Sequence, residues 1–293
     1  MNKKGKFSLS ALPREILAIA LFLIYMIPFA IVLINSAKPR LEIIVDPLAI
    51  PTNPELWENI VRVWSHPRVQ YASSFFSSVV ITAVSVCLLV LIASMAAWVL
   101  VRTKTKLSSA IFMIFVAAMV IPFQVVMFPL INWFFRIEQF LGLSARTPFR
   151  LLGDYPGIIF AYLGFGSSLS IFLFHGFTKS VPLELEEAAI IDGCSRPATF
   201  FKIVFPLLTP IAVTVIILNG IWIWNDFLLP FLLLMGGNVQ TLPLAVQSFV
   251  GAFVRQWELI LTSTLMAMVP IIVMFLFLQK YIVKGMVEGS VKG

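Results

Sequence analysis

A polar segment at residues 182–210 lies between two long apolar runs and holds the residues most able to contact another protein. Three acidic residues follow Pro182: Glu184, Glu186 and Glu187. Negative charge in a first turn stabilises a helix N-terminus, so the pattern predicts a short helix. Gly193 suits the left-handed position that ends a helix, and a second helix is predicted to begin near Ser195.

Small side chains make this predicted helix suitable for docking. Leu185, Ala188, Ala189 and Asp192 fall on one face by the three-and-four spacing of a helix. Two adjacent alanines let another surface approach the backbone closely. The sequence therefore predicts a docking element that membrane insertion alone does not require.

The chain lacks the motifs of a self-contained enzyme. It has no Gly-x4-Gly-Lys-Ser/Thr phosphate loop, no His-Glu-x-x-His pair and no Gly-x-Ser-x-Gly elbow. Its two cysteines, Cys87 and Cys194, and its two histidines, His66 and His175, have no metal-ligand spacing. We therefore expect no catalytic residue, no metal site and no cofactor bound by this chain. Energy for any uphill work has to come from a partner.

A second group of polar residues lies inside an apolar run and is a candidate solute path. Asp226 is the only acidic residue within a predicted span, and charge there usually faces a cavity or a partner. The candidates are Trp222, Trp224, Asn225, Asp226 and, in an earlier run, Gln124. The alternative is that Asn225 and Asp226 cap a broken helix or bond to a neighbouring span. For Gln124 the alternative is a hydrogen bond between helices.

Composition places the chain in a membrane. Of its 293 residues 60% are hydrophobic, and the mean hydropathy is +0.98. Its apolar runs are about 20 residues long without the alternation of barrel strands, so an all-α membrane protein is predicted. The net charge of +7 comes from residues that flank apolar runs, which argues against nucleic acid as a partner.

Six membrane-spanning helices are predicted in a single permease domain at residues 16–293, after an N-terminal segment at 1–15. The spans are expected at about 16–36, 75–101, 107–131, 156–177, 207–235 and 259–279. The first run is longer than a signal-peptide core, so it is interpreted as a retained span. Pro122, Gln124 and Pro129 are expected to interrupt the third span.

The distribution of basic residues predicts the orientation. Residues 1–15, 102–107, 178–206 and 280–293 hold 13 Lys and Arg in 64 residues. The opposite connections hold 8 in 85 residues. The more basic side is cytoplasmic by the positive-inside rule, which puts both termini and the 178–206 loop in the cytosol.

The loop also resembles a known family signature. Glu187, Ala188 and Ala189, then Gly193 after three residues, Ile203 after nine and Pro206 after two match the cytoplasmic loop of ABC importer permeases. Asp192 precedes the glycine as in that pattern. Three further stretches resemble the second permease of the maltose-type carbohydrate subfamily: residues 224–227, 241–243 and 279–293. The resemblance covers roughly residues 70–293.

The resemblance implies a type I importer in the cytoplasmic membrane. Such a complex has two homologous permeases, two cytosolic ATPases that bind ATP and Mg²⁺, and an extracytoplasmic solute-binding protein. It implies that Glu187 contacts the ATPase, that Ala188 and Ala189 allow close approach, and that Gly193 makes the turn. Ile203 and Pro206 would hold the second helix against the bundle. The favoured solute is a sugar or oligosaccharide, carried by alternating access.

Two other functions remain open from the sequence. The first is import of glycerol-phosphate or another polar solute, which would favour basic residues in the path. The second belongs to a different class: a membrane sensor or scaffold that binds an ATPase without moving solute. An intramembrane enzyme is disfavoured because no nucleophile and base cluster together.

Overall fold

The computed structural model describes residues 12–67, 69–143, 147, 150–250 and 256–290, with side chains described as far as Gln279. Within these residues every regular element is a helix, which confirms the predicted all-α class. The chain divides into two compact units, Met1–Gln70 with Val246–Met268, and Tyr71–Ala245 with Val269–Gly293. Residues 1–11 of the predicted N-terminal segment at 1–15 and the side chains of residues 280–293 lie outside the described residues.

The first unit is built around the end of the first apolar helix. It contains α1 (Leu12–Ser36), α2 (Arg40–Val45), α3 (Leu56–Trp64) and the start of α14 (Trp257–Ser290). The Asn59 amide donates to the backbone carbonyls of Ser36 at 3.1 Å and Lys38 at 3.3 Å. The Thr262 hydroxyl also donates to the Ser36 carbonyl, at 3.0 Å. These bonds tie α3 and α14 to the last turn of α1.

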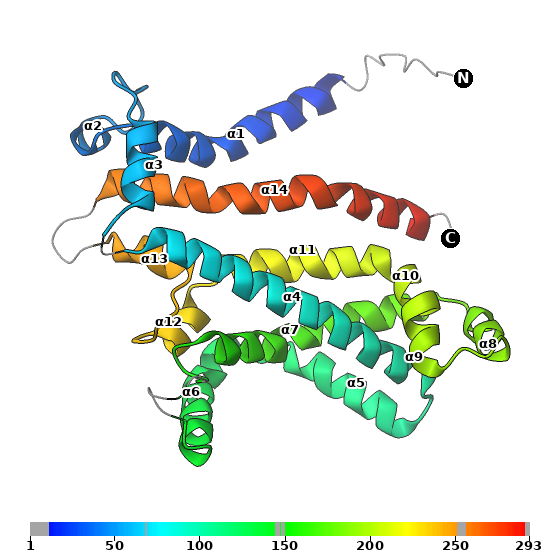
Figure 1. Cartoon of the computed structure of the whole chain (residues 1–293). Helices are drawn as coiled ribbons and strands as arrows, with labels where there is room; N and C mark the ends of the chain where they lie inside the picture. The colour runs from blue at the N-terminus through cyan, green and yellow to red at the C-terminus, as the bar shows by residue number, and fades with distance from the viewer. Residues whose placement is uncertain (1–11, 68, 144–146, 148–149, 251–255, 291–293) are drawn as a thin grey trace. The chain divides into compact units, whose positions relative to one another are not determined.

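The second unit contains the helices that position the candidate sites (Figure 1). In chain order they are α4 (Tyr71–Arg102), α5 (Lys106–Ala118), α6 (Phe123–Phe140), α7 (Tyr155–Thr178), α8 (Leu183–Ile191), α9 (Arg196–Thr199), η1 (Phe200–Val204), α10 (Phe205–Leu207), α11 (Thr209–Asn225), α12 (Leu228–Leu234) and α13 (Leu242–Ser248). The rest of α14 belongs to it as well.

Close packing of α4, α7 and α11 forms the centre of this unit. The buried face of α4 carries serines and alanines, whose small side chains let membrane helices approach closely. A Cβ on Gly166 of α7 would lie 2.6 Å from Leu89 Cδ1 and 2.9 Å from Asn219 Oδ1. Glycine at position 166 therefore lets α7 pack closely against α4 and α11.

Four described helices are long and apolar enough to cross a membrane, and six spans result if each of two bent pairs counts as one. The four are Leu12–Ser36, Tyr71–Arg102, Tyr155–Thr178 and Trp257–Gln279. They correspond to the predicted first, second, fourth and sixth spans.

The predicted third span at 107–131 differs from the structure. Lys106–Ala118 and Phe123–Phe140 are bent by 106° at the break before Pro122. Proline has no N–H to donate and restricts the residue before it, so α5 ends there. The second helix continues past the predicted boundary to Phe140, and Pro129 lies inside it.

The predicted fifth span at 207–235 also differs from the structure, because the chain breaks near Leu208 and again after Asn225. Arg196–Leu207 and Thr209–Asn225 meet at 75°. The membrane helix then ends at Asn225, nine residues before α12 ends at Leu234, so the predicted run at 207–235 is two helices. Pro206 and Pro210 flank the first break and cannot donate backbone hydrogen bonds, which accounts for its position.

A buried carboxylate fixes the connection into α7. Glu138 Oε1 accepts hydrogen bonds from the N–H groups of Leu151 at 2.7 Å and Leu152 at 2.8 Å. The turn then continues through Gly153, whose φ is +79° and whose N–H donates to the Leu233 carbonyl at 2.7 Å. Glu138, near the end of α6, therefore anchors the start of α7.

Candidate functional site

The first half of the polar segment forms α8, and its C-terminal closure follows from glycine at position 193. Gly193 has a φ of +85°, in the left-handed region that favours glycine. Its N–H donates to the Ile190 carbonyl at 3.0 Å, and the Cys194 N–H donates to the Ala189 carbonyl at 2.9 Å. This pair of bonds is a Schellman motif, so the predicted turn at Gly193 is confirmed.

The second half begins where the sequence predicts it. The Ser195 hydroxyl accepts a hydrogen bond from the Ala198 N–H at 3.4 Å and caps α9. The helix widens into the π-helical turn η1 before Pro206. Phe200 and Val204 are buried on this stretch, whereas Ile203 is half-buried and Pro206 is exposed. Phe200 and Val204 therefore make the contact with the bundle that was assigned to Ile203 and Pro206.

The predicted docking face of α8 is only partly open to solvent. Leu185, Ala188 and Asp192 are exposed, and so is the neighbouring Glu187. Ala189 was predicted to lie on the same face, but it is only 6% exposed and packs against the chain itself. An apolar face without cover on a short helix is typical of a protein contact.

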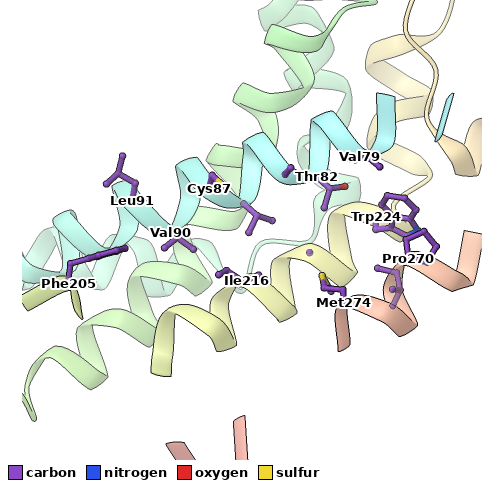
Figure 2. A pocket seen from close by; sticks show the side chains of 14 residues that line it. Val79, Thr82, Cys87, Val90, Leu91, Phe205, Ile216, Trp224, Pro270 and Met274 are labelled. Carbon is purple, nitrogen blue, oxygen red and sulfur yellow. The ribbon is translucent and has the colours of Figure 1, made fainter. Parts of the chain in front are cut away.

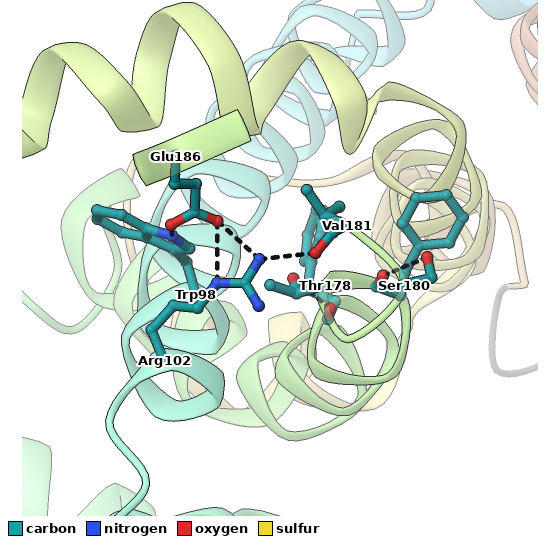
Figure 3. Close-up of polar contacts among 8 residues, drawn as sticks. Trp98, Arg102, Thr178, Ser180, Val181 and Glu186 are labelled. Carbon is teal, nitrogen blue, oxygen red and sulfur yellow. Dashed lines mark hydrogen bonds and ion pairs between the residues drawn. The ribbon is translucent and has the colours of Figure 1, made fainter. Parts of the chain in front are cut away.

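Glu186 of α8 makes contacts that the sequence did not indicate. Its side chain is buried and reaches the C-terminal end of α4 (Figure 3). Trp98 Nε1 donates to Oε2 at 2.9 Å, and Arg102 donates to Oε1 through Nε at 2.9 Å and Nη2 at 2.7 Å. Arg102 Nη2 also donates to the Val181 carbonyl at 2.9 Å. We call Trp98, Arg102, Val181 and Glu186 the α4–α8 clamp.

The signal for the clamp in the sequence was weak. Of the two adjacent glutamates, Glu186 is buried and Glu187 is exposed, and the family signature selects Glu187. The partner of Glu186 is Arg102, which lies 84 residues earlier. In the sequence Arg102 is one of the basic residues that flank a span and indicate its orientation. The sequence signal that could have indicated the clamp is a second glutamate next to the signature glutamate, together with an arginine at the end of an earlier span.

In the candidate solute path, Asp226 has the capping and bonding role that was the alternative prediction. Its Oδ1 accepts from the Leu228 N–H at 3.1 Å at the start of α12. Its Oδ2 accepts from the Tyr162 hydroxyl of α7 at 3.1 Å. The Tyr162 ring meets Trp222 edge to face, with 5.5 Å between the centroids. The sequence did not indicate Tyr162.

The other candidates of the solute path do not gather at one place. Trp222 lines an open cavity of about 550 Å³ between α5, α6, α7 and α11, together with Asn219 and Ser168. Asn225 is exposed and donates to the Ile221 carbonyl of its own helix at 2.8 Å. Gln124 is exposed in the first turn of α6 and is not among the cavity-lining residues.

Trp224 belongs to a different cavity. It is 5% exposed, its ring meets Phe75 edge to face at 6.0 Å, and it lines an apolar cavity of about 520 Å³. Figure 2 shows this cavity with Trp224 near Pro270 and Met274 of α14 and with Cys87 on α4. Its lining is almost entirely apolar, so it offers no recognition of a polar solute.

The described residues contain no group of three His, Cys, Asp or Glu side chains that would hold a metal ion. The ion pairs among the described residues are Arg102 with Glu186 in the second unit and Arg62 with Glu55 in the first. What the second unit offers instead is an exposed loop, a buried clamp and one partly polar cavity, and these suit docking and passage rather than covalent chemistry.

Comparisons with known proteins agree with this geometry. The chain is 37% identical over 276 residues to the probable starch degradation products transport system permease protein AmyC of Thermoanaerobacterium thermosulfurigenes, covering 94% of this chain and 95% of that one. It is 35% identical to the melibiose/raffinose/stachyose import permease protein MelC of Bacillus subtilis, covering 92% of each.

A solved structure shares the fold. It is described as a bacterial ABC transporter involved in the import of the acidic polysaccharide alginate. It aligns with a TM-score of 0.76 at 18% identity, over 95% of this chain and 99% of that chain. Residues 64–288 match the family described as "Binding-protein-dependent transport system inner membrane component". The predicted resemblance is therefore confirmed, and the chain belongs to this family of ABC transporter permeases.

Proposed function

We propose that this chain is a permease subunit of an ATP-driven importer that moves a sugar or oligosaccharide across the cytoplasmic membrane. The observation that carries the proposal is the exposed, glycine-closed α8 in a chain that has no nucleotide-binding loop. The relatives named for starch degradation products and for melibiose, raffinose and stachyose support a carbohydrate as the solute.

The proposed complex contains four further proteins. A second, homologous permease completes the path, two ATPases hold ATP and Mg²⁺, and a binding protein delivers the solute from outside. The ATPase would contact Glu187, Ala188 and Asp192 on the exposed face of α8, with Gly193 fixing the turn. The excess of basic residues on this side supports a cytosolic loop and cytosolic termini.

The cavity beside Trp222 supports passage of a neutral polar solute. Its wall is mainly apolar and aromatic, with Asn219 and Ser168 as polar groups, which is the usual composition of a small-molecule site. Among the described residues that line it none is basic, which disfavours a phosphate-bearing solute as the alternative.

Reconstitution tests the proposal. The chain, its partner permease and both ATPases are placed in liposomes with the binding protein and with radiolabelled melibiose or maltotriose. We expect ATP-dependent accumulation that needs the binding protein. Binding-protein-stimulated hydrolysis without accumulation of any offered sugar would favour the sensor function. Accumulation of glycerol-phosphate alone would favour the other importer.

Two variants in the predicted fifth span distinguish a residue that lines the solute path from a residue that caps a helix. Trp222→Ala should raise the KM of uptake by about 2- to 12-fold, since aromatic contacts contribute about 0.5–1.5 kcal/mol. Asp226→Asn should instead lower stability by about 1 kcal/mol, because it weakens a helix cap and the bond to Tyr162.

Uptake kinetics and thermal unfolding of the purified complex measure both effects, with Trp222→Phe as the control that keeps an aromatic ring. A changed solute preference in Asp226→Asn, with unchanged stability, would contradict the capping role.

A further inference from the structure

The side chain of Glu186 is saturated by donors from another helix. Its residue is 4% exposed, and both carboxylate oxygens accept hydrogen bonds from α4. Arg102 contributes two N–H groups from a planar fork and is itself largely covered. Charge-assisted, two-point contacts of this kind define both the distance and the direction between two elements.

This contact is the link between α8 and α4. The backbone of α8 packs against α9 and η1. Only Glu186 and Ala189 are buried among the α8 side chains. In the described part of the chain, the hydrogen bonds that join α8 to α4 all end on Glu186. Figure 3 shows this carboxylate pointing between Trp98 and Arg102.

The clamp connects the loop to the centre of the bundle. Helix α4 is 32 residues long, about 48 Å, and packs along α7 and α11. The ring of Trp98 also contacts Phe200 of η1, with centroids 5.2 Å apart, so the clamp reaches the second half of the loop as well. A displacement of α8 is therefore transmitted to α4 through short, directional hydrogen bonds.

We propose that Glu186, Arg102 and Trp98 are positioning residues that make α8 and α4 move as one body when the ATPases act. This inference rests on the proposed function and adds the path by which loop movement enters a membrane helix. Burying an ion pair contributes little net stability compared with apolar packing, because desolvation offsets the attraction. The directional hydrogen bonds of the clamp can instead transmit the movement of α8 to α4 as a rigid body, which non-directional apolar packing against so short a helix would not do.

Coupling measurements test the clamp in the assembled transporter. Solute uptake and ATP hydrolysis are recorded in the same proteoliposomes for Trp98→Phe, Arg102→Lys and Glu186→Gln. Glu186→Gln keeps the size of the side chain, Arg102→Lys keeps the charge and Trp98→Phe keeps an aromatic ring, while each removes hydrogen bonds of the clamp. Bound ATPase is quantified for each. Glu184→Gln is the matched control, since Glu184 is an exposed carboxylate on the same helix.

We expect at least a fivefold rise in ATP hydrolysed per solute for Glu186→Gln, with the ATPases still bound, a smaller rise for the other two, and none for the control. An unchanged ratio in Glu186→Gln, or a rise of the same size in Glu184→Gln, would overturn the inference. Wild-type complex that hydrolyses ATP without importing sugar would instead overturn the proposed function.

A distance measurement in the wild-type complex tests the clamp without depending on the assembly of the variants. Spin labels on cysteines introduced at positions 99 of α4 and 184 of α8, with Cys87 and Cys194 changed to serine, report the separation of α4 and α8 in the whole complex. The separation should be the same in nucleotide-free and ATP-bound wild type and should broaden in Arg102→Lys. A separation that changes on ATP binding in the wild type would show that α8 moves against α4, and the inference would be wrong.

Discussion

Gly157→Ala is expected to destabilise the folded chain strongly. A Cβ on Gly157 would lie 1.7 Å from the Leu151 carbonyl oxygen and 2.6 Å from its carbonyl carbon. The obstacle is backbone, and Glu138 holds that backbone in place through the Leu151 N–H. The clash can be relieved only if the backbone at Leu151 moves and its hydrogen bond to Glu138 is lost. The free energy of unfolding should therefore fall by about 3 kcal/mol or more.

The monodisperse fraction and the apparent Tm of the detergent-purified complex measure this effect. A loss of about 3 kcal/mol corresponds to a fall in Tm of about 10 °C. Gly176→Ala is the matched control, because Gly176 lies in the same helix and a Cβ there meets no atom within 4 Å. Equal stability of the two variants would show that the turn before α7 is looser than the structure has it.

Valine at position 193 is expected to abolish most ATP-dependent uptake while the membrane helices remain folded. The added side chain has open space around it within this chain, so the effect comes from the backbone. Left-handed φ costs an L-residue about 1–2 kcal/mol and costs a β-branched residue more. The loop conformation that docks should become at least about tenfold rarer.

Asparagine provides the graded comparison, since it tolerates the left-handed region better than other non-glycine residues. Binding of the ATPases to the permeases by co-purification, together with uptake, should decrease in the order Gly, Asn, Val. Thermal unfolding of the membrane part should stay unchanged. Wild-type uptake with valine would show that the turn at Gly193 does not support coupling, and would remove the role assigned to it.

The apolar runs and the glycine turn were predictable because they depend on local chemistry. Twenty apolar residues exclude a soluble helix, and Gly193 is placed between a helix and a capping serine within five residues. Each signal lies within a short window, so its outcome does not depend on distant parts of the chain. The family signature added the role of the loop.

Bends and buried polar contacts were less predictable for the opposite reason. Pro122 and Pro129 are the same residue type in one apolar run, yet the first ends a helix and the second lies inside α6. Neighbouring helices in a membrane protein decide which missing hydrogen bond is tolerated. The angle of 106° at that break depends on the same packing.

The clamp shows most directly that a buried polar contact depends on residues far apart in the sequence. Glu186 and Glu187 have identical side chains, but only Glu186 is buried, where it bonds to Trp98 and Arg102 of α4. The same holds for Asp226, whose partner Tyr162 is 64 residues away on α7. A window around either carboxylate does not contain its partner.

The exposed face of α8 also bears on how the chain survives before it is assembled. Leu185, Ile190 and Ile191 are 44%, 54% and 84% exposed. Apolar side chains of this size in water are recognised by chaperones and favour aggregation. In the proposed complex the ATPase would cover these side chains, so a newly made copy that has not yet assembled would leave them exposed. We expect the steady-state amount of this chain to follow the supply of ATPase subunits.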